Sequence, residues 1–77
     1  MYNRERLNAI FRSVFLLGPE EPLEDKTMLN VDAWNSVEHF AFVSELEESF
    51  GIRLKQEDII AMTSYSAVLA VLKKYGV

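Results

Sequence analysis

The chain has 77 residues, no cysteine and a formal net charge of −4, so we expect one domain over residues 1–77 without disulfides or thiolate metal sites. No apolar run approaches the ~18 residues that a membrane span needs, and no uninterrupted apolar stretch follows the charged N-terminus as in a signal peptide. These features predict a soluble, cytoplasmic protein that does not enter a membrane.

The first predicted helix covers residues 3–16 and is followed by a long connection over residues 17–34. Asn3 is expected to cap the helix, and Gly18-Pro19 to end it, because proline disfavours helical geometry in the residue before it. The apolar face of the helix comprises Leu7, Ile10, Phe11 and Val14. The apolar residues expected to hold the connection against the core are Leu23, Met28, Leu29 and Val31. A loop of this length in a small domain is unusual and often functional.

The second predicted helix covers residues 36–50. Asn35 is a favourable N-cap, Glu38 completes a capping-box pattern, and Gly51 ends the helix. At about 100° per residue, the apolar side of this helix comprises His39, Val43, Leu46 and Phe50, flanked by Phe40 and Phe42. The opposite side comprises Val37, Glu38, Ala41, Ser44, Glu45 and Glu48.

The last part of the chain predicts two further helices. Residues 52–55 alternate in polarity, which predicts an extended link or a very short strand. A short third helix is predicted from Gln56 to Ala61, with Ile59 and Ile60 facing inward. A final helix over about 65–75 follows a cap at Thr63 or Ser64, and its buried face comprises Tyr65, Val68, Leu72 and Tyr75. The fold class is therefore all-α: a small four-helix bundle of three longer helices and one short helix, with a long loop between the first and second.

The acidic residues are concentrated in the middle of the chain. Residues 27–52 contain Asp32, Glu38, Glu45, Glu47 and Glu48 but no lysine or arginine. Such a block repels nucleic acid and attracts basic partners. A merely solvated, solubilising surface would show the same pattern, so the charge alone leaves both interpretations open.

Ser36 is the residue with the most chemical interest. It lies three residues from His39, the one histidine, and a serine–histidine pair is a candidate nucleophile and base. There is no glycine-rich nucleophile elbow, and we expect His39 to pack half-buried beside Trp34 or the loop. A serine just after an N-cap also projects from a helix N-terminus, where a phosphate is favoured. A plain polar residue of the first turn is equally consistent with this position.

Several segments resemble acyl and peptidyl carrier proteins, and together they cover nearly the whole chain. Trp34-Asn35-Ser36-Val37 is similar to the Asp-Ser-Leu signature of this family, and Leu46-Glu47-Glu48-Ser49-Phe50-Gly51-Ile52 is similar to its Leu-Glu-Glu-x-Phe-Gly-Ile stretch. Asp58-Ile59-Ile60 and Met62-Thr63-Ser64 resemble its third helix and the start of its fourth. The resemblance implies that Ser36 accepts 4'-phosphopantetheine from coenzyme A. It also implies that the protein is not an enzyme but carries an acyl or aminoacyl group as a thioester.

The resemblance further implies the partners and the docking surface. The partners would be a phosphopantetheinyl transferase, an acyl- or aminoacyl-loading ligase, and synthase or transferase enzymes with basic patches. They would dock on the exposed side of the second helix, formed by Val37, Glu38, Ala41, Ser44, Glu45 and Glu48. The protein would be a monomer without metal or nucleic acid, serving fatty acid, polyketide or nonribosomal peptide biosynthesis.

The chain departs from the family pattern near Ser36. Asn35 replaces the usual aspartate, Val37 replaces leucine, and Trp34 replaces a small residue. Ala41 and Ser44 replace the common glutamate and an apolar residue. These differences favour a free-standing carrier of a specialised pathway, and Asn35 keeps open an alternative. In that alternative the chain is an unmodified carrier-like module that binds a basic partner through its acidic second helix.

The apolar residues expected to form the core are Phe40, Phe42, Leu46, Leu54, Ile59, Met62 and Val68. In carrier proteins, part of such a core can open to shelter a growing chain. The aromatic crowding in this sequence predicts room for short groups only.

Overall fold

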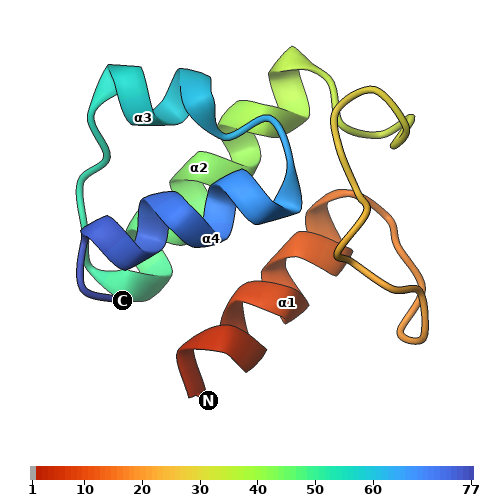
Figure 1. Cartoon of the computed structure of the whole chain (residues 1–77), viewed down its shortest axis with the longest axis horizontal. Helices are drawn as coiled ribbons and strands as arrows, with labels where there is room; N and C mark the ends of the chain where they lie inside the picture. The colour runs from red at the N-terminus through yellow and green to blue at the C-terminus, as the bar shows by residue number, and fades with distance from the viewer. Residues whose placement is uncertain (1) are drawn as a thin grey trace.

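The computed structural model describes residues 2–77, which form four helices (Figure 1). The helices are α1 (Tyr2–Val14), α2 (Ser36–Phe50), α3 (Gln56–Ala61) and α4 (Tyr65–Lys74). Residues 2–77 contain no strand, and residues 52–55 form an extended link. The predicted all-α fold, with its short third helix and long first loop, is confirmed.

The helix boundaries agree with the predictions except in α1. This helix begins at Tyr2, so Asn3 lies within it and is not its cap. It ends at Val14, two residues early, because Leu16 adopts the left-handed conformation with a φ of 57°. The Leu17 N–H then donates to the Arg12 carbonyl at 2.9 Å, which closes a Schellman-type helix end.

The caps of α2 and α4 follow the sequence signals. The Ser64 hydroxyl accepts the Ala67 N–H at 3.1 Å, so Ser64 rather than Thr63 caps α4. At the end of α2, Gly51 adopts a left-handed φ of 65°, a conformation that glycine reaches without a steric penalty. Local side-chain chemistry therefore determines where α2 and α4 begin and where α2 ends.

An aromatic cluster forms the centre of the core and links α1, α2 and the loop before α2. Phe11, Phe15, Trp34 and Phe42 are all buried. The rings of Phe11 and Trp34 meet edge to face with centroids 5.2 Å apart, and Phe15 stacks on Trp34 at 4.5 Å. Aromatic pairs of this kind contribute about 0.5–1.5 kcal/mol beyond their buried area. Trp34 is therefore fixed in the core. Because Trp34 ends the loop just before α2, its packing also fixes where α2 begins.

Three apolar side chains predicted to face the core are exposed instead. Phe40 is 63% exposed and Ile60 is 66% exposed, because the rotation of α2 and α3 in the bundle turns them away from the core while His39 and Ile59 face it. Leu29 is 98% exposed in the turn that begins at Thr27. The rest of the predicted core is buried or partly buried: Phe42, Leu46, Leu54, Ile59, Met62 and Val68.

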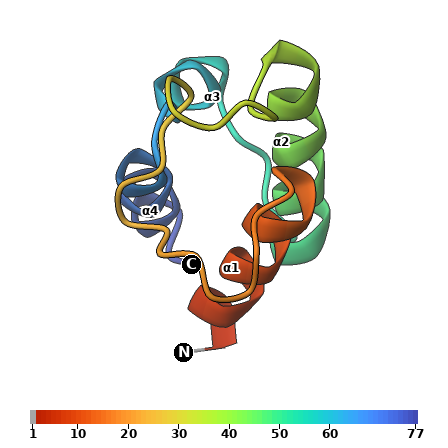
Figure 2. The same cartoon turned by 90° about the vertical axis from the view of Figure 1, so that its right-hand side faces the viewer.

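The long loop is held to the bundle by backbone hydrogen bonds as well as by apolar contacts. It crosses from α1 to the side of α3 and α4 and then returns to the start of α2 (Figure 2). The Met28 N–H donates to the Thr63 carbonyl and the Tyr65 N–H donates to the Lys26 carbonyl, both at 3.0 Å. Leu23 and Val31 are buried as predicted, and Met28 is partly buried. The start of α2 is therefore presented by an ordered loop.

Candidate functional site

Ser36 is the first residue of α2, and it is exposed. Asn35 precedes it in an extended conformation, and the Asn35 Oδ1 accepts the Glu38 N–H at 3.0 Å. The Asn35 carbonyl accepts the His39 N–H at 2.7 Å, which begins the helical hydrogen bonding. The N–H groups of the first turn have no acceptor within a helix, and the positive end of the helix dipole favours an anion there. The start of α2 thus offers a hydroxyl where an attached phosphate would be stabilised.

A buried hydrogen-bonded chain behind Ser36 joins the loop, α2 and α3. The Trp34 Nε1–H donates to the His39 Nδ1 at 2.9 Å, and the His39 Nε2 lies 2.9 Å from the Ile59 carbonyl. An indole N–H can only donate, so Nδ1 is the acceptor and Nε2 carries the proton that is donated to Ile59. The predicted packing of His39 beside Trp34 is confirmed, with His39 buried rather than half-buried. Both ring nitrogens of His39 form hydrogen bonds to other residues, Trp34 and Ile59, so His39 is not positioned to act as a base for Ser36.

The six residues of the predicted docking surface share one side of α2. Val37, Ala41, Ser44, Glu45 and Glu48 are exposed, and Glu38 is half-buried. Val37 is 74% exposed, which makes it an apolar contact point close to Ser36. The structure therefore gathers the predicted residues on an accessible face that begins at the candidate site.

Sequence reasoning missed two exposed apolar side chains near this face. Phe40 of α2 and Ile60 of α3 were assigned to the core by their apolar character. The Nε2 of His39, which precedes Phe40, lies 2.9 Å from the carbonyl oxygen of Ile59, which precedes Ile60. This part of α2 therefore lies beside α3. Only the exact rotation of each helix distinguishes these side chains from buried ones, and the sequence contains no local signal for it.

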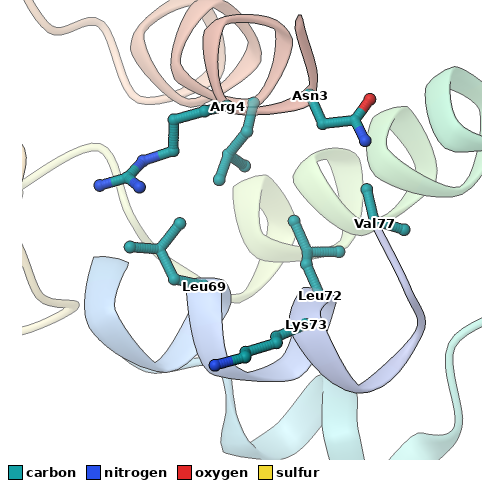
Figure 3. A pocket seen from close by; sticks show the side chains of 7 residues that line it. Asn3, Arg4, Leu69, Leu72, Lys73 and Val77 are labelled. Atoms are coloured by element: carbon teal, nitrogen blue, oxygen red, sulfur yellow. The ribbon is translucent and has the colours of Figure 1, made fainter. Parts of the chain in front are cut away.

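A groove opens beside Ser36 between the end of α1 and α2, with a volume of about 480 Å³. It is lined by Ser13, Val14, Leu16, Ala33, Asn35, Glu38, Ala41 and Glu45, and we call it the α1–α2 groove. Another hollow, of about 340 Å³, lies between the start of α1 and α4, where Arg4 and Lys73 flank leucine side chains (Figure 3). The start of α1 and the N-terminal end of α2 lie at opposite ends of the molecule (Figure 1), so this second hollow is far from Ser36.

A second polar cluster that the sequence did not reveal fastens α3 to the end of α4. The buried carboxylate of Asp58 accepts hydrogen bonds from the Lys74 Nζ and the Tyr75 hydroxyl, each at 2.6 Å. These two bonds hold the pKa of Asp58 below its ordinary value, and the same contacts raise the pKa of Lys74 and of Tyr75. The Tyr75 oxygen also accepts the Lys55 N–H at 3.0 Å. The cluster steadies α3, whose Ile59 carbonyl meets His39.

Comparisons with known proteins bear on the fold. No protein-family model and no curated protein matches the chain. Among solved structures, the chain is similar to one described as "a putative acyl carrier protein" from Mycobacterium tuberculosis. The match has a TM-score of 0.78 and 17% sequence identity, and it covers 92% of this chain and 95% of the other. The chain has an acyl carrier protein fold.

Two further observations concern residues 2–77. No helix in this range is both long and apolar enough to cross a membrane. Within the same residues, no three histidine, aspartate or glutamate side chains come together as ligands for a metal ion.

Proposed function

We propose that this chain is an acyl carrier protein, a single domain over residues 1–77. It holds an acyl or aminoacyl group as a thioester on a 4'-phosphopantetheine arm attached to Ser36. The observation that carries the proposal is the exposed serine at the capped start of α2, in a fold shared with a solved structure described as a putative acyl carrier protein. The resemblance of residues 34–37 and 46–52 to carrier-protein sequences supports it independently.

The residues at the start of α2 fit this group. The Ser36 hydroxyl is accessible to a transferase, and the N–H groups of the first turn favour the negative charge of a phosphodiester. In the transfer, the Ser36 oxygen forms a bond to the phosphorus nearer to pantetheine in coenzyme A. The bond from that phosphorus to the departing adenosine 3',5'-bisphosphate breaks, and the serine proton passes to a base of the transferase. When attached, the arm supplies the thiol that holds the carried group.

The exposed side of α2 would be the docking surface for the partner enzymes. Glu45 and Glu48 are exposed on this side and attract lysine and arginine patches, and Val37 adds an apolar contact. Charge complementarity of this kind speeds association more than it strengthens binding, which suits a carrier that must leave each enzyme. The partners would be a phosphopantetheinyl transferase, a loading ligase and acyl-processing enzymes. The carrier itself would be a cytoplasmic monomer that performs no catalysis.

Intact mass spectrometry tests the attachment. Co-expression with a broad-specificity phosphopantetheinyl transferase should add the mass of one arm, and Ser36→Ala should abolish the gain. Ser66→Ala is a matched control, because Ser66 is also an exposed serine in the first turn of a capped helix, α4. The control should gain the arm as the natural chain does.

The same experiment distinguishes the alternative of an unmodified interaction module. If no transferase modifies the natural chain, and Asn35→Asp does not restore modification, the carrier proposal is refuted. Binding of a basic partner that is weakened by Glu45→Lys and Glu48→Lys would then support the interaction module instead.

A further inference from the structure

The α1–α2 groove lies where the end of an arm on Ser36 could rest. Asn35, the residue before Ser36, lines the groove, and Glu38, Ala41 and Glu45 line it further along α2. Its volume of about 480 Å³ is within the range of small-molecule sites. The groove is therefore both adjacent to the attachment point and large enough for a small carried group.

The rim of the groove has a strained residue. Leu16 adopts the left-handed conformation, with a φ of 57°, and its side chain is 81% exposed. Both features are unfavourable for leucine, and Gly51 shows the usual solution to the same backbone geometry at the end of α2. The chain thus holds an apolar side chain at the rim where a glycine would relieve the backbone. The left-handed backbone itself belongs to the end of α1, so the feature that bears on the groove is the exposed apolar side chain at its rim.

The polar side chains of the groove favour a cation. Glu38 and Glu45 are seven residues apart in α2, so they lie on the same side of the helix about two turns apart. The lining contains no lysine or arginine, and the ion pairs found among residues 2–77 involve Lys26 and Lys74 but neither of these glutamates. Beside them, Val14, Leu16 and Ala41 supply apolar contacts. A small apolar group that carries an ammonium complements this lining.

The core is a poor alternative place for a carried group. Phe42, Leu46 and Met62 have no exposed surface, and the Trp34–His39–Ile59 chain joins the loop, α2 and α3 behind Ser36. Opening the core there would break these hydrogen bonds and leave buried polar groups without partners, which is costly. A group held outside the core avoids this cost.

We propose that the α1–α2 groove receives an aminoacyl group on the Ser36 arm, with the ammonium of that group facing Glu38 and Glu45. This inference rests on the proposed attachment at Ser36. Glu45 is nine residues from Ser36, about 14 Å along the helix at 1.5 Å per residue, which an extended arm exceeds. Because Glu38 and Glu45 also belong to the proposed docking surface, a basic partner enzyme competes with the ammonium for them and releases the carried group.

The test uses a chemically attached arm. The chain has no cysteine, so Ser36→Cys introduces a unique thiol that can be alkylated with a pantetheine-like arm. Two arms are compared, ending in an alanyl amide or in a propionyl amide, which differ only in the amino group. Amide chemical shifts of Ser13, Leu16 and Ala41 are followed by NMR. Two weak ion pairs of the ammonium, one with half-buried Glu38 and one with exposed Glu45, predict roughly fivefold higher occupancy of the groove by the alanyl arm.

Matched variants identify the cause of the effect. Glu38→Gln with Glu45→Gln should make the two arms equivalent, whereas Glu20→Gln with Glu24→Gln removes two exposed loop carboxylates and should preserve the difference. Raising the pH above about 8, where an α-amino group loses its proton, should also make the arms equivalent. Leu16→Gly should reduce groove shifts for both arms without lowering the melting temperature.

Equal groove shifts for both arms, or alanyl-dependent shifts confined to other residues, would overturn the inference. The outcome is separate from that of the attachment proposal, because the arm is placed here without a transferase. Failure of transferases to modify both the natural chain and Asn35→Asp would refute the carrier function, whereas the NMR comparison tests whether the groove prefers a group with an ammonium.

Discussion

The cap at Asn35 should determine how firmly α2 begins at Ser36. Its Oδ1 accepts the Glu38 N–H at 3.0 Å, and Asn35→Ala would leave that N–H without its side-chain acceptor. Loss of an N-cap costs about 1 kcal/mol, within a range of about 0.5–2 kcal/mol. For a domain of this size, 1 kcal/mol lowers the melting temperature by about 4–8 °C.

The assay is thermal and urea denaturation followed by circular dichroism. Ser64→Ala is an internal comparison, because the Ser64 hydroxyl caps α4 through the Ala67 N–H at 3.1 Å, and we expect a similar loss. Asn35→Asp retains an acceptor and should leave the melting temperature at or above that of the natural chain, since an anion is favoured at a helix N-terminus.

The reasoning is refuted if Asn35→Ala has the same melting temperature as the natural chain while Ser64→Ala has a lower one. That result would mean that the aromatic packing of Trp34 alone fixes the start of α2. Asn35→Asp also reports on function. Faster arm addition to this variant at unchanged stability would assign a recognition role to the charge, separate from its role as a cap.

Three further changes probe the structure around the site. His39→Leu leaves the buried Trp34 N–H without its acceptor and should cost about 1–3 kcal/mol in urea denaturation, and Trp34→Phe should cost less in that background than in the natural chain. Gly51→Ala meets no neighbouring atom within 4 Å but forces alanine to a φ of 65°, so it should cost about 1 kcal/mol from backbone strain alone. In Asp58→Asn, the urea midpoint should fall less steeply than in the natural chain as the pH is lowered from 5 to about 2.

The sign of the acid effect follows from the lowered pKa of Asp58. The folded carboxylate, which accepts hydrogen bonds from Lys74 and Tyr75, binds protons less readily than the unfolded one, whose pKa has its ordinary value of 3.8. Its stabilising contribution is complete above that value and is lost as the pH falls through the folded pKa. The raised pKa values of Lys74 and Tyr75 have the opposite dependence, because their contributions are lost as the pH rises through the folded values. An unchanged acid slope in Asp58→Asn would show that other carboxylates dominate it.

Local signals in the sequence determine the helix framework. Asn35, Ser64 and Gly51 act on their own neighbouring N–H groups or backbone angles, so their roles can be predicted without knowing the rest of the fold. The apolar periodicity of α1, α2 and α4 is equally local and correctly indicates most of the core. Ser36 could therefore be placed at an exposed helix start from the sequence alone.

Only the tertiary structure decides which apolar side chains leave the core and which distant polar groups meet. Phe40 and Ile60 are as apolar as their buried neighbours, and their exposure depends on how α2 and α3 are rotated against the bundle. The contacts of His39 with Ile59 and of Asp58 with Lys74 join residues 20 and 16 positions apart, which no local pattern specifies. The groove beside Ser36 is lined both by residues at the end of α1 and by residues of α2, so it exists only where the folded chain packs these helices together. The sequence alone indicated Ser36 as the proposed attachment residue, and the packing of the helices decided what surrounds it.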